Sequence, residues 1–323
     1  EKEMYTFEDR GGNSLTLKPE GTPSVCRAYM EHGLHNLPQP VKLYYIAPIF
    51  RYERPQAGRY RQHHQFGCEA IGDDDPALDA QVISTAWQFF VSLGLSDFSL
   101  QINSIGCKKC RPGYLTVLTG YYSYRTVELC PECKTRLKRN PLRLLDCKNP
   151  SCQQVVNSAP KSIDHLCSEC DAHFNHLRRY LGLLEISCEV NHRLVRGLDY
   201  YTRTVFEVQP EEEKAQSALG GGGRYDDLIQ ELGGKSAPAL GFACGIERII
   251  LNLQKQDVTV PPLPRPQVFI AYLSDEAKNK ALKLVSTLRQ ADIGVIEAIG
   301  NRSLKAQLRQ ANALNVSKTV IIG

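Results

Sequence analysis

The chain has 323 residues, of which 42% are hydrophobic and 23% charged, and its formal net charge is +4. These proportions are typical of a globular protein with two or three domains. No apolar run reaches the roughly 18 residues of a transmembrane helix, and no basic stretch followed by an apolar one indicates a signal peptide. The sequence therefore favours a cytoplasmic protein over a membrane or secreted one. Its mild positive charge is compatible with a nucleic-acid partner and equally with an ordinary solvated surface.

Both ends of the chain predict a fragment. Strand-like alternation is already present at Met4, Tyr5 and Phe7, and residues 320–322 form an apolar, strand-like run at the other end. We therefore expect further sequence on both sides.

The first hundred residues alternate between helix and strand signals. Thr22 and Pro23 predict an N-cap and a first helical residue, and Gly33 is a suitable end for that helix. Residues 41–50 are rich in aromatic and β-branched side chains, which favours a strand. A second helix is predicted over residues 75–94, where apolar side chains recur at helical spacing.

Two strand-like runs flank a Pro-Gln-Ala-Gly loop between residues 50 and 69, which predicts a long antiparallel hairpin. The hairpin carries Arg51, Arg54, Arg59 and Arg61. Arginines this close repel one another unless they bind a polyanion such as a triphosphate or RNA. A solvated basic hairpin is the alternative.

Three further runs could approach a ligand, and each also has a structural explanation. Glu20 precedes the first helix, where a carboxylate either meets the helix dipole or binds a ligand ammonium group. The glycines at 220–223 allow a close backbone approach or form a flexible turn, and they lack the lysine of a phosphate-binding loop. At residues 241–248 a strand runs into a helix that carries Arg248.

The run from Leu194 to Tyr201 places Arg196 and Asp199 within an apolar segment that continues into a predicted strand. A buried arginine is costly without an anionic partner. This run therefore predicts either a pocket for a negatively charged ligand or an ordinary buried Arg–Asp pair.

Eight of the twelve cysteines form four closely spaced pairs in a basic segment. Such pairs are typical zinc ligands, and a large chain without a secretion signal favours metal over disulfides. Two pairs would complete one structural site, so the segment predicts two zinc sites. The spacing does not say which pairs combine, and eight reduced structural cysteines are the alternative. The pairs are Cys107 and Cys110, Cys130 and Cys133, Cys147 and Cys152, and Cys167 and Cys170.

The last part of the chain follows a proline-rich linker at residues 261–266. Strand and helix signals alternate beyond it, which predicts a small α/β domain with a parallel sheet. The strands are expected at 267–273, 293–299 and 318–322, with helices at 275–291 and 303–314.

Together these motifs resemble those of class II aminoacyl-tRNA synthetases. The arginine-rich hairpin resembles motif 2 of that class and the Gly-Ile-Glu-Arg run resembles motif 3, whereas motif 1 would lie upstream of this chain. The runs KPEGT, LVRGLDYY and GGGRYD are similar to those of the histidyl-tRNA synthetase family. The resemblance implies an α/β (α+β) fold with an antiparallel-sheet catalytic core over 1–106 and 183–258, a Cys-rich insertion over 107–182, and a truncated α/β anticodon-binding domain over 267–323.

The resemblance also implies an activity. A homodimeric enzyme of this family activates L-histidine with ATP and Mg²⁺ to histidyl-adenylate, and then transfers the histidyl group to the 3′ end of tRNA-His. The catalytic residues implied are Arg51, Arg196 and Arg248. The residues implied for ATP binding are Arg51, Glu53, Arg59, His63 and Arg248. Those implied for histidine binding are Glu20, Thr22, Gln65, Glu69, Tyr200, Tyr201 and Tyr225.

Two positions depart from the family pattern. Lys18 stands where the family often has arginine, which keeps the positive charge but loses the forked geometry of the donors. His63 stands where phenylalanine usually stacks on adenine, which predicts a weaker or pH-sensitive contact.

Two other functions remain open at this stage. A regulatory subunit of ATP phosphoribosyltransferase would share the fold and sense histidine without catalysis, although such relatives lack the C-terminal domain and part of the arginine set. A zinc-dependent RNA-binding protein without enzymatic activity would explain the cysteines and the basic balance but not Glu20, Glu69 and Tyr201.

Overall fold

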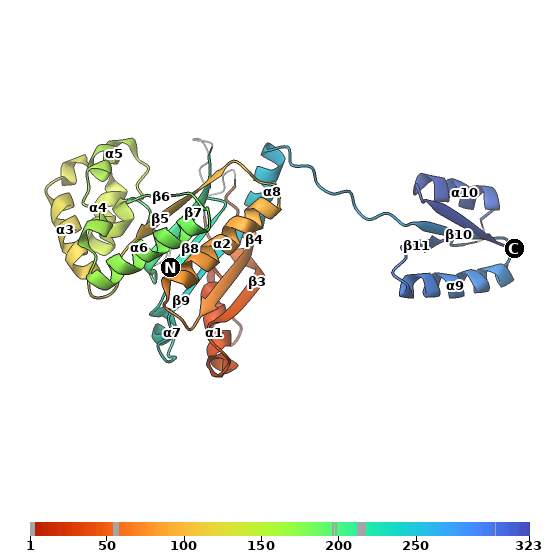
Figure 1. Cartoon of the computed structure of the whole chain (residues 1–323), viewed down its shortest axis with the longest axis horizontal. Coiled ribbons are helices and arrows are strands. Elements are labelled where there is room, and N and C mark those ends of the chain that lie inside the picture. Colours follow the sequence, from red (N-terminus) through yellow and green to blue (C-terminus); the bar gives the residue numbers. More distant parts are fainter. Residues whose placement is uncertain (1–3, 54–57, 196, 198, 212–217, 301) are drawn as a thin grey trace. The chain divides into compact units, whose positions relative to one another are not determined.

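The computed structural model describes residues 4–53, 58–195, 197, 199–211, 218–300 and 302–323. Its helices and strands form two compact units, Glu1–Val258 and Thr259–Gly323 (Figure 1). Within the described ranges, no helix combines the length and the apolar character that spanning a bilayer requires.

A seven-stranded sheet forms the centre of the first unit. In spatial order its strands are β3 (Val41–Phe50), β4 (Gln62–Ile71), β9 (Ala239–Gly245), β8 (Gly220–Arg224), β7 (Thr202–Pro210), β5 (Phe98–Ser104) and β6 (Cys188–Val190). Every neighbouring pair is antiparallel except β5 and β6. The predicted antiparallel core is therefore confirmed. A separate two-stranded antiparallel sheet pairs β1 (Thr6–Glu8) with β2 (Ser14–Thr16).

The predicted hairpin is formed by β3 and β4, which pair over all ten residues of each strand. Side chains alternate between the two faces of a strand. In β4, Phe66 and Cys68 pack against the main hydrophobic core. Gln65 and Glu69 therefore point to the opposite face of the sheet, where the candidate site lies.

Two long helices cover the core face of the sheet. α2 (Pro76–Ser92) packs on β4, β7, β8 and β9, and α6 (Ser168–Leu183) lies along α2 (Figure 1). The Asp75 carboxylate caps α2 by accepting a hydrogen bond from the Ala77 N–H at 2.7 Å. The core between these layers includes Phe90, Leu177, Phe206 and Leu240.

The predicted cap of the first helix is wrong. α1 (Thr22–Glu31) has Gly21 at its N-cap position, and no side chain caps it. The Thr22 hydroxyl instead donates to the Glu69 carboxylate at 2.7 Å, so a tertiary partner replaces the local one. The remaining short elements of this unit are η1 (Leu34–Asn36), α7 (Leu228–Glu231) and α8 (Ile246–Lys255).

A buried ionic network joins the sheet to both covering helices. The Arg224 guanidinium, which is fully buried at the end of β8, donates to Asp79 of α2 at 2.7 Å and to Asp226 at 3.1 Å. The second carboxylate oxygen of Asp79 lies 2.8 Å from Nε2 of His173 on α6. Burying these charges is tolerated because each has a charged or hydrogen-bonding partner.

The Cys-rich segment forms a small helical module between β5 and α6. Its elements are α3 (Arg111–Ser123), η2 (Thr126–Glu128), α4 (Pro131–Arg139), η3 (Pro141–Leu144), α5 (Pro150–Asn157) and η4 (Ser162–His165). The core of the module, which includes Tyr114 and Leu144, is continuous with Val195, Tyr201 and Val205. The module therefore packs directly on the run that precedes β7.

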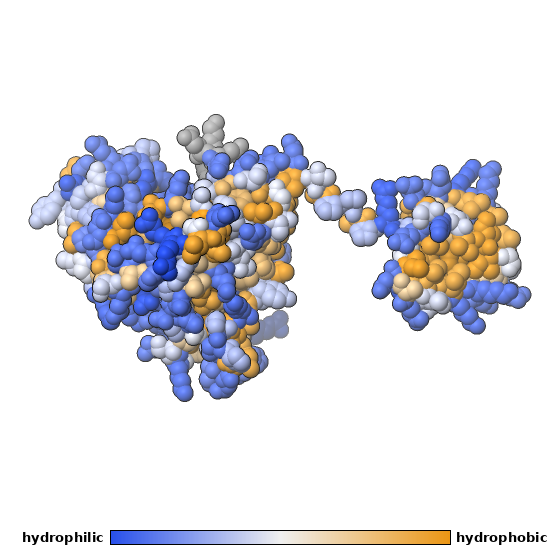
Figure 2. All heavy atoms as spheres, in the orientation of Figure 1, coloured by the Kyte–Doolittle hydropathy of each residue, from blue (hydrophilic) through white to orange (hydrophobic). Residues whose placement is uncertain are grey.

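The second unit is a three-layer α/β domain. Its parallel sheet has the order β11 (Val295–Glu297), β10 (Val268–Tyr272) and β12 (Lys318–Ile322), with α9 (Asp275–Gln290) and α10 (Leu304–Ala313) on either side of it (Figure 1). The predicted parallel sheet is confirmed. Apolar residues gather on the face of this unit that Figure 2 shows, and its exposed large apolar side chains include Leu273, Val320 and Ile321.

Candidate active site

A cavity of about 350 Å³ opens on the face of the seven-stranded sheet that α2 and α6 leave uncovered. It brings together every described residue that the sequence predicted for the site. These are Glu20, Thr22, Arg51, Glu53, Arg59, His63, Gln65, Glu69, Tyr200, Tyr201, Tyr225 and Arg248. Arg196, the remaining predicted residue, lies outside the described residues, as does Arg54 of the hairpin.

The floor of the cavity is made of glycine-rich strands. β8 contains Gly220 to Gly223 and lies between β7 and β9. A Cβ atom on Gly222 would collide with the Gly241 carbonyl, and one on Gly241 would collide with the Glu69 carboxylate. The glycine run is therefore a closely packed strand that brings backbone up to the site, and not a flexible turn.

Glu69 lies at the deep end of the cavity and is only 2% exposed. Its carboxylate accepts hydrogen bonds from Thr22 Oγ1 at 2.7 Å and from Tyr225 Oη at 2.6 Å. Burial raises the pKa of Glu69 from its ordinary 4.5 to about 7, although the two hydrogen bonds oppose the shift. This end of the cavity is built to receive a hydrogen-bond donor or a cation.

A second carboxylate lies beside the first. Tyr200 Oη donates to Glu20 Oε2 at 2.6 Å, and burial raises the pKa of Glu20. Because Glu20 contacts Tyr200 and does not cap α1, the capping alternative for this residue is not supported. The amide oxygen of Gln65 is buried without a hydrogen-bond partner among the described residues. An unpaired acceptor here indicates a place for a ligand donor.

Arginines gather at the other end of the cavity. Arg51 Nε donates to the Pro19 carbonyl at 2.8 Å, and Arg248 Nε donates to the Gly58 carbonyl at 2.8 Å. Arg248 Nη1 also donates to the Ala218 carbonyl at 3.5 Å, so backbone contacts orient both guanidinium groups. Arg59 lies 3.8 Å from the Glu53 carboxylate. Such an arrangement of fixed cations suits a phosphate-bearing ligand.

His63 lies at the same end. Burial, and then the nearby Arg51, lower the pKa of His63 to about 4. The imidazole is therefore neutral near pH 7, so the pH-sensitive contact predicted for this position would appear only in acid. The next residue, His64, pairs through Nδ1 with Glu247 at 2.8 Å, and Glu247 also accepts from the His64 N–H.

The sequence missed several residues that line the cavity. Tyr45 lies on β3, and Glu207 and Gln209 lie on β7. Glu207 and Gln209 are two positions apart, so strand alternation could have predicted that they share one face of the sheet. Asp146 and Lys148 come from the Cys-rich module, on either side of Cys147. No sequence signal linked these two to the site, because their position depends on how the module folds back.

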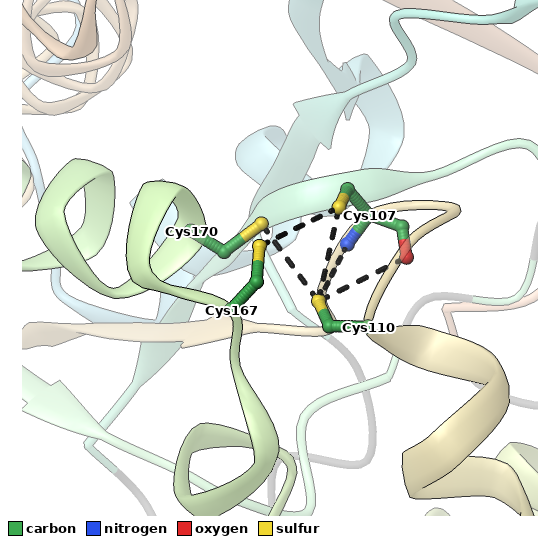
Figure 3. Close-up of side chains that lie close together, drawn as sticks. All are labelled: Cys107, Cys110, Cys167 and Cys170. Atoms are coloured by element: carbon green, nitrogen blue, oxygen red, sulfur yellow. Dashed lines mark hydrogen bonds between the residues drawn. The ribbon is translucent and has the colours of Figure 1, made fainter.

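The structure settles which cysteine pairs combine. Cys107, Cys110, Cys167 and Cys170 form one cluster (Figure 3), and Cys130, Cys133, Cys147 and Cys152 form the other. Neighbouring sulfurs lie 3.8–3.9 Å apart in the first cluster, and Cys130 and Cys147 lie 4.0 Å apart in the second. A tetrahedral zinc–thiolate site with bonds of about 2.3 Å places its sulfurs about 3.8 Å apart. Both clusters could hold a metal ion.

Comparison with known proteins identifies the family. Residues 5–257 match the tRNA synthetase class II core domain (G, H, P, S and T), and residues 267–323 match the anticodon binding domain. The chain is 58% identical over 322 residues to a histidine–tRNA ligase of Dehalococcoides mccartyi, covering 100% of this chain and 77% of that protein. This chain belongs to the histidine–tRNA ligase family. A relative of the same name from Desulforamulus reducens is 50% identical over 323 residues, with the same two coverages.

Solved structures agree with the assignment to the histidine–tRNA ligase family. The apo histidyl-tRNA synthetase of S. aureus matches with a TM-score of 0.81 and 38% identity, over 99% of this chain and 78% of that one. A Bacillus halodurans chain described as an ATP phosphoribosyltransferase regulatory subunit/histidyl-tRNA synthetase matches with a TM-score of 0.65 at 21% identity, over 99% and 83%. That second match shows a shared fold only. The class II core and anticodon-binding domain that the sequence predicted are therefore confirmed.

Proposed function

We propose that this chain carries the active site of a histidine–tRNA ligase, which activates L-histidine with ATP and transfers the histidyl group to tRNA-His. The observation that carries the proposal is the distribution of charge in one cavity, which has carboxylates and tyrosines at one end and arginines at the other. A cationic, hydrogen-bonding amino acid fits the first end, and a triphosphate fits the second.

The histidine end is assigned by hydrogen-bonding capacity. Imidazole offers one donor and one acceptor, so a carboxylate and a phenol can hold both ring nitrogens. We assign these roles to Glu69 and Tyr201. Thr22 and Tyr225 orient Glu69 through the hydrogen bonds described above, and Glu20 and Gln65 hold the α-ammonium and carboxylate groups. The partly buried Tyr200 keeps Glu20 in place.

The ATP end is assigned by charge. In the first step a carboxylate oxygen of histidine attacks the α-phosphorus, the bond to the bridging oxygen breaks, and pyrophosphate leaves. This reaction requires positioning and positive charge more than covalent participation by the protein. We assign Arg51 to the α-phosphate, Arg59 and Arg248 to the other phosphates, and His63 and Glu53 to adenine. Arg196 stays a prediction for the α-phosphate.

The remaining partners follow from the family. Class II synthetases use ATP with Mg²⁺, which would offset part of the charge on the phosphates. We propose tRNA-His as the acceptor, supported by the anticodon-binding domain at 267–323. We also propose a homodimer, and a cytoplasmic location where ATP and tRNA are available.

We propose Zn²⁺ as the occupant of both cysteine clusters. Four thiolates complete a tetrahedral shell and leave no open position, so these metal ions would be structural. Elemental analysis of protein purified without chelator should find two zinc ions per chain, one for each cluster. A metal content near zero would show that the cysteines are reduced and metal-free.

Histidine-dependent exchange between ATP and pyrophosphate, measured without tRNA, tests the activation step. We expect exchange that requires histidine and is lost in Arg196→Ala. Binding of histidine without any exchange would instead favour the regulatory function that the Bacillus halodurans description mentions. Absence of both would contradict the proposed function.

A further inference from the structure

The Cys-rich module contributes a wall to the active-site cavity. Cys147 is a member of the second cluster, and its two neighbours in the chain, Asp146 and Lys148, both line the cavity. Lys148 is the only lysine among the described residues that do so. A member of the second cysteine cluster therefore lies directly between two residues that line the cavity.

Several contacts hold this wall in place. Asn140 Nδ2 donates to Asp199 at 2.6 Å, and Arg143 Nη1 donates to the Gly197 carbonyl at 2.7 Å. Residues 140–143 are therefore hydrogen-bonded to the segment from Leu194 to Tyr201, which resembles the histidyl-tRNA synthetase family. The Cys147 carbonyl accepts from Gln153 Nε2 at 2.6 Å. The same carbonyl accepts from Arg193 Nη2 at 3.4 Å, and the Cys147 N–H donates to the Leu144 carbonyl at 3.1 Å. The Cys147 sulfur adds a further constraint, because it lies in the second cluster.

Strand register places the wall over the middle of the cavity. Asp146 and Lys148 line the cavity together with Glu207 of β7. Glu207 pairs with Gly221, which pairs with Ala243, which in turn pairs with Gly67 of β4. Gly67 lies two residues from Glu69, which is at the deep end of the cavity, and two residues from Gln65, which is on the side of the arginines. The wall thus lies between the carboxylate end and the arginine end of the cavity.

We propose that the second cluster is a positioning site for the reaction: its metal holds residues 140–148 as a wall of the active site, so that Lys148 contacts a phosphate group at the reacting centre. The inference rests on the proposed function. The phosphate is either that of ATP in the first step or that of the tRNA 3′ end in the second. A lysine can serve either, because its ammonium group acts as a point charge without fixed geometry.

Lys148→Ala tests the contact, with Lys134→Ala as the matched control. Lys134 follows Cys133 of the same cluster, is exposed and does not line the cavity. We measure ATP–pyrophosphate exchange without tRNA, and single-turnover transfer from preformed histidyl-adenylate to tRNA. We expect Lys148→Ala to lower the rate of one of these steps at least about tenfold, with the KM for histidine unchanged.

The affected step identifies the phosphate. Loss in the exchange assay assigns Lys148 to ATP, and loss confined to transfer assigns it to the tRNA 3′ end. If both rates match those of Lys134→Ala, the contact does not exist and the inference is overturned, while wild-type exchange still supports the proposed function. Absence of exchange in the wild-type protein would count against the proposed function itself.

Cys152→Ser tests the positioning role of the metal, because Cys152 is a cluster member that lies outside residues 140–148 and does not line the cavity. We expect one zinc ion fewer per chain and the same kinetic defect as Lys148→Ala. Adding Lys148→Ala to Cys152→Ser should then cause little further loss, because the two changes remove one interaction. Full additivity of the two defects would show that the metal does not position Lys148. If Cys152→Ser fails to fold, the Lys148→Ala comparison still decides the contact.

Discussion

At the scale of single residues, the site depends on carboxylates held in an environment that disfavours their charge. Glu69 is buried at the end of the cavity and receives two hydrogen bonds, from Thr22 and Tyr225. Those bonds stabilise the carboxylate only in part, since the pKa of Glu69 still rises to about 7. Without ligand, the protein therefore stores an unfavourable charge that a bound cation or imidazole N–H would relieve.

Glu69→Gln should change how stability depends on pH. The pKa of Glu69 is higher in the folded state, so folding binds a proton between pH 4.5 and about 7, and its contribution to stability is lost as the pH rises through that window. A shift of this size corresponds to about 3 kcal/mol. We expect the unfolding free energy of the ligand-free variant, relative to wild type, to increase from pH 5 to pH 8. Parallel pH profiles in denaturant titrations would contradict the assigned pKa.

At the scale of elements, the strands β8 and β9 are specified by close packing more than by strand propensity. Glycine is a poor strand former, yet Gly220 to Gly223 form a buried central strand. The reason is steric, because side chains at Gly222 or Gly241 would occupy space taken by neighbouring backbone and by Glu69.

Gly241→Ala should therefore be damaging even though alanine is small. Its Cβ would meet the Glu69 carboxylate and the Cys68 carbonyl. We expect a loss of about 1–3 kcal/mol in unfolding free energy, together with weaker histidine binding. Gly120→Ala is the control, because Gly120 lies within α3 with nothing near its Cβ position, and alanine there should stabilise by about 0.5–1 kcal/mol. Equal effects at both positions in calorimetry would contradict the steric explanation.

The sequence could predict elements and pocket residues where local signals were strong. The hairpin of β3 and β4, and the parallel sheet of β10 to β12, follow from runs of residues whose pattern is complete in itself. The prediction that Thr22 caps the first helix was wrong, because its hydroxyl bonds to Glu69, a partner 47 residues away in the sequence. The cysteine pairing and Lys148 were beyond reach for the same reason, since both depend on how the module closes.

At the scale of the whole molecule, the two units have separate hydrophobic cores. The core of the second unit is formed by residues from Phe269 to Ala311 and includes none from the first. A proline-rich segment at 261–266 joins them. The cavity is lined entirely by the first unit.

A chain that ends at Val258 should separate the two steps of the proposed reaction. Because the cavity belongs to the first unit, histidine-dependent exchange should stay within about threefold of the longer protein. Charging of tRNA at limiting tRNA should fall at least about tenfold, because one of two linked binding surfaces is lost. Steady-state kinetics of both assays check this. A matching loss of exchange would show that the second unit is needed to build the site.

Arg224 and Tyr225 are neighbours in the chain, but their side chains contact different parts of the molecule. Arg224 is fully buried against Asp79 and ties the sheet to α2, whereas Tyr225 holds the carboxylate in the pocket. Two adjacent residues thus serve different roles, one in stabilising the fold and the other in shaping the proposed histidine site. A backbone shift at either residue would therefore disturb both contacts. Variants selected for a new amino-acid substrate would be expected to change Tyr225 only together with compensating changes around Asp79.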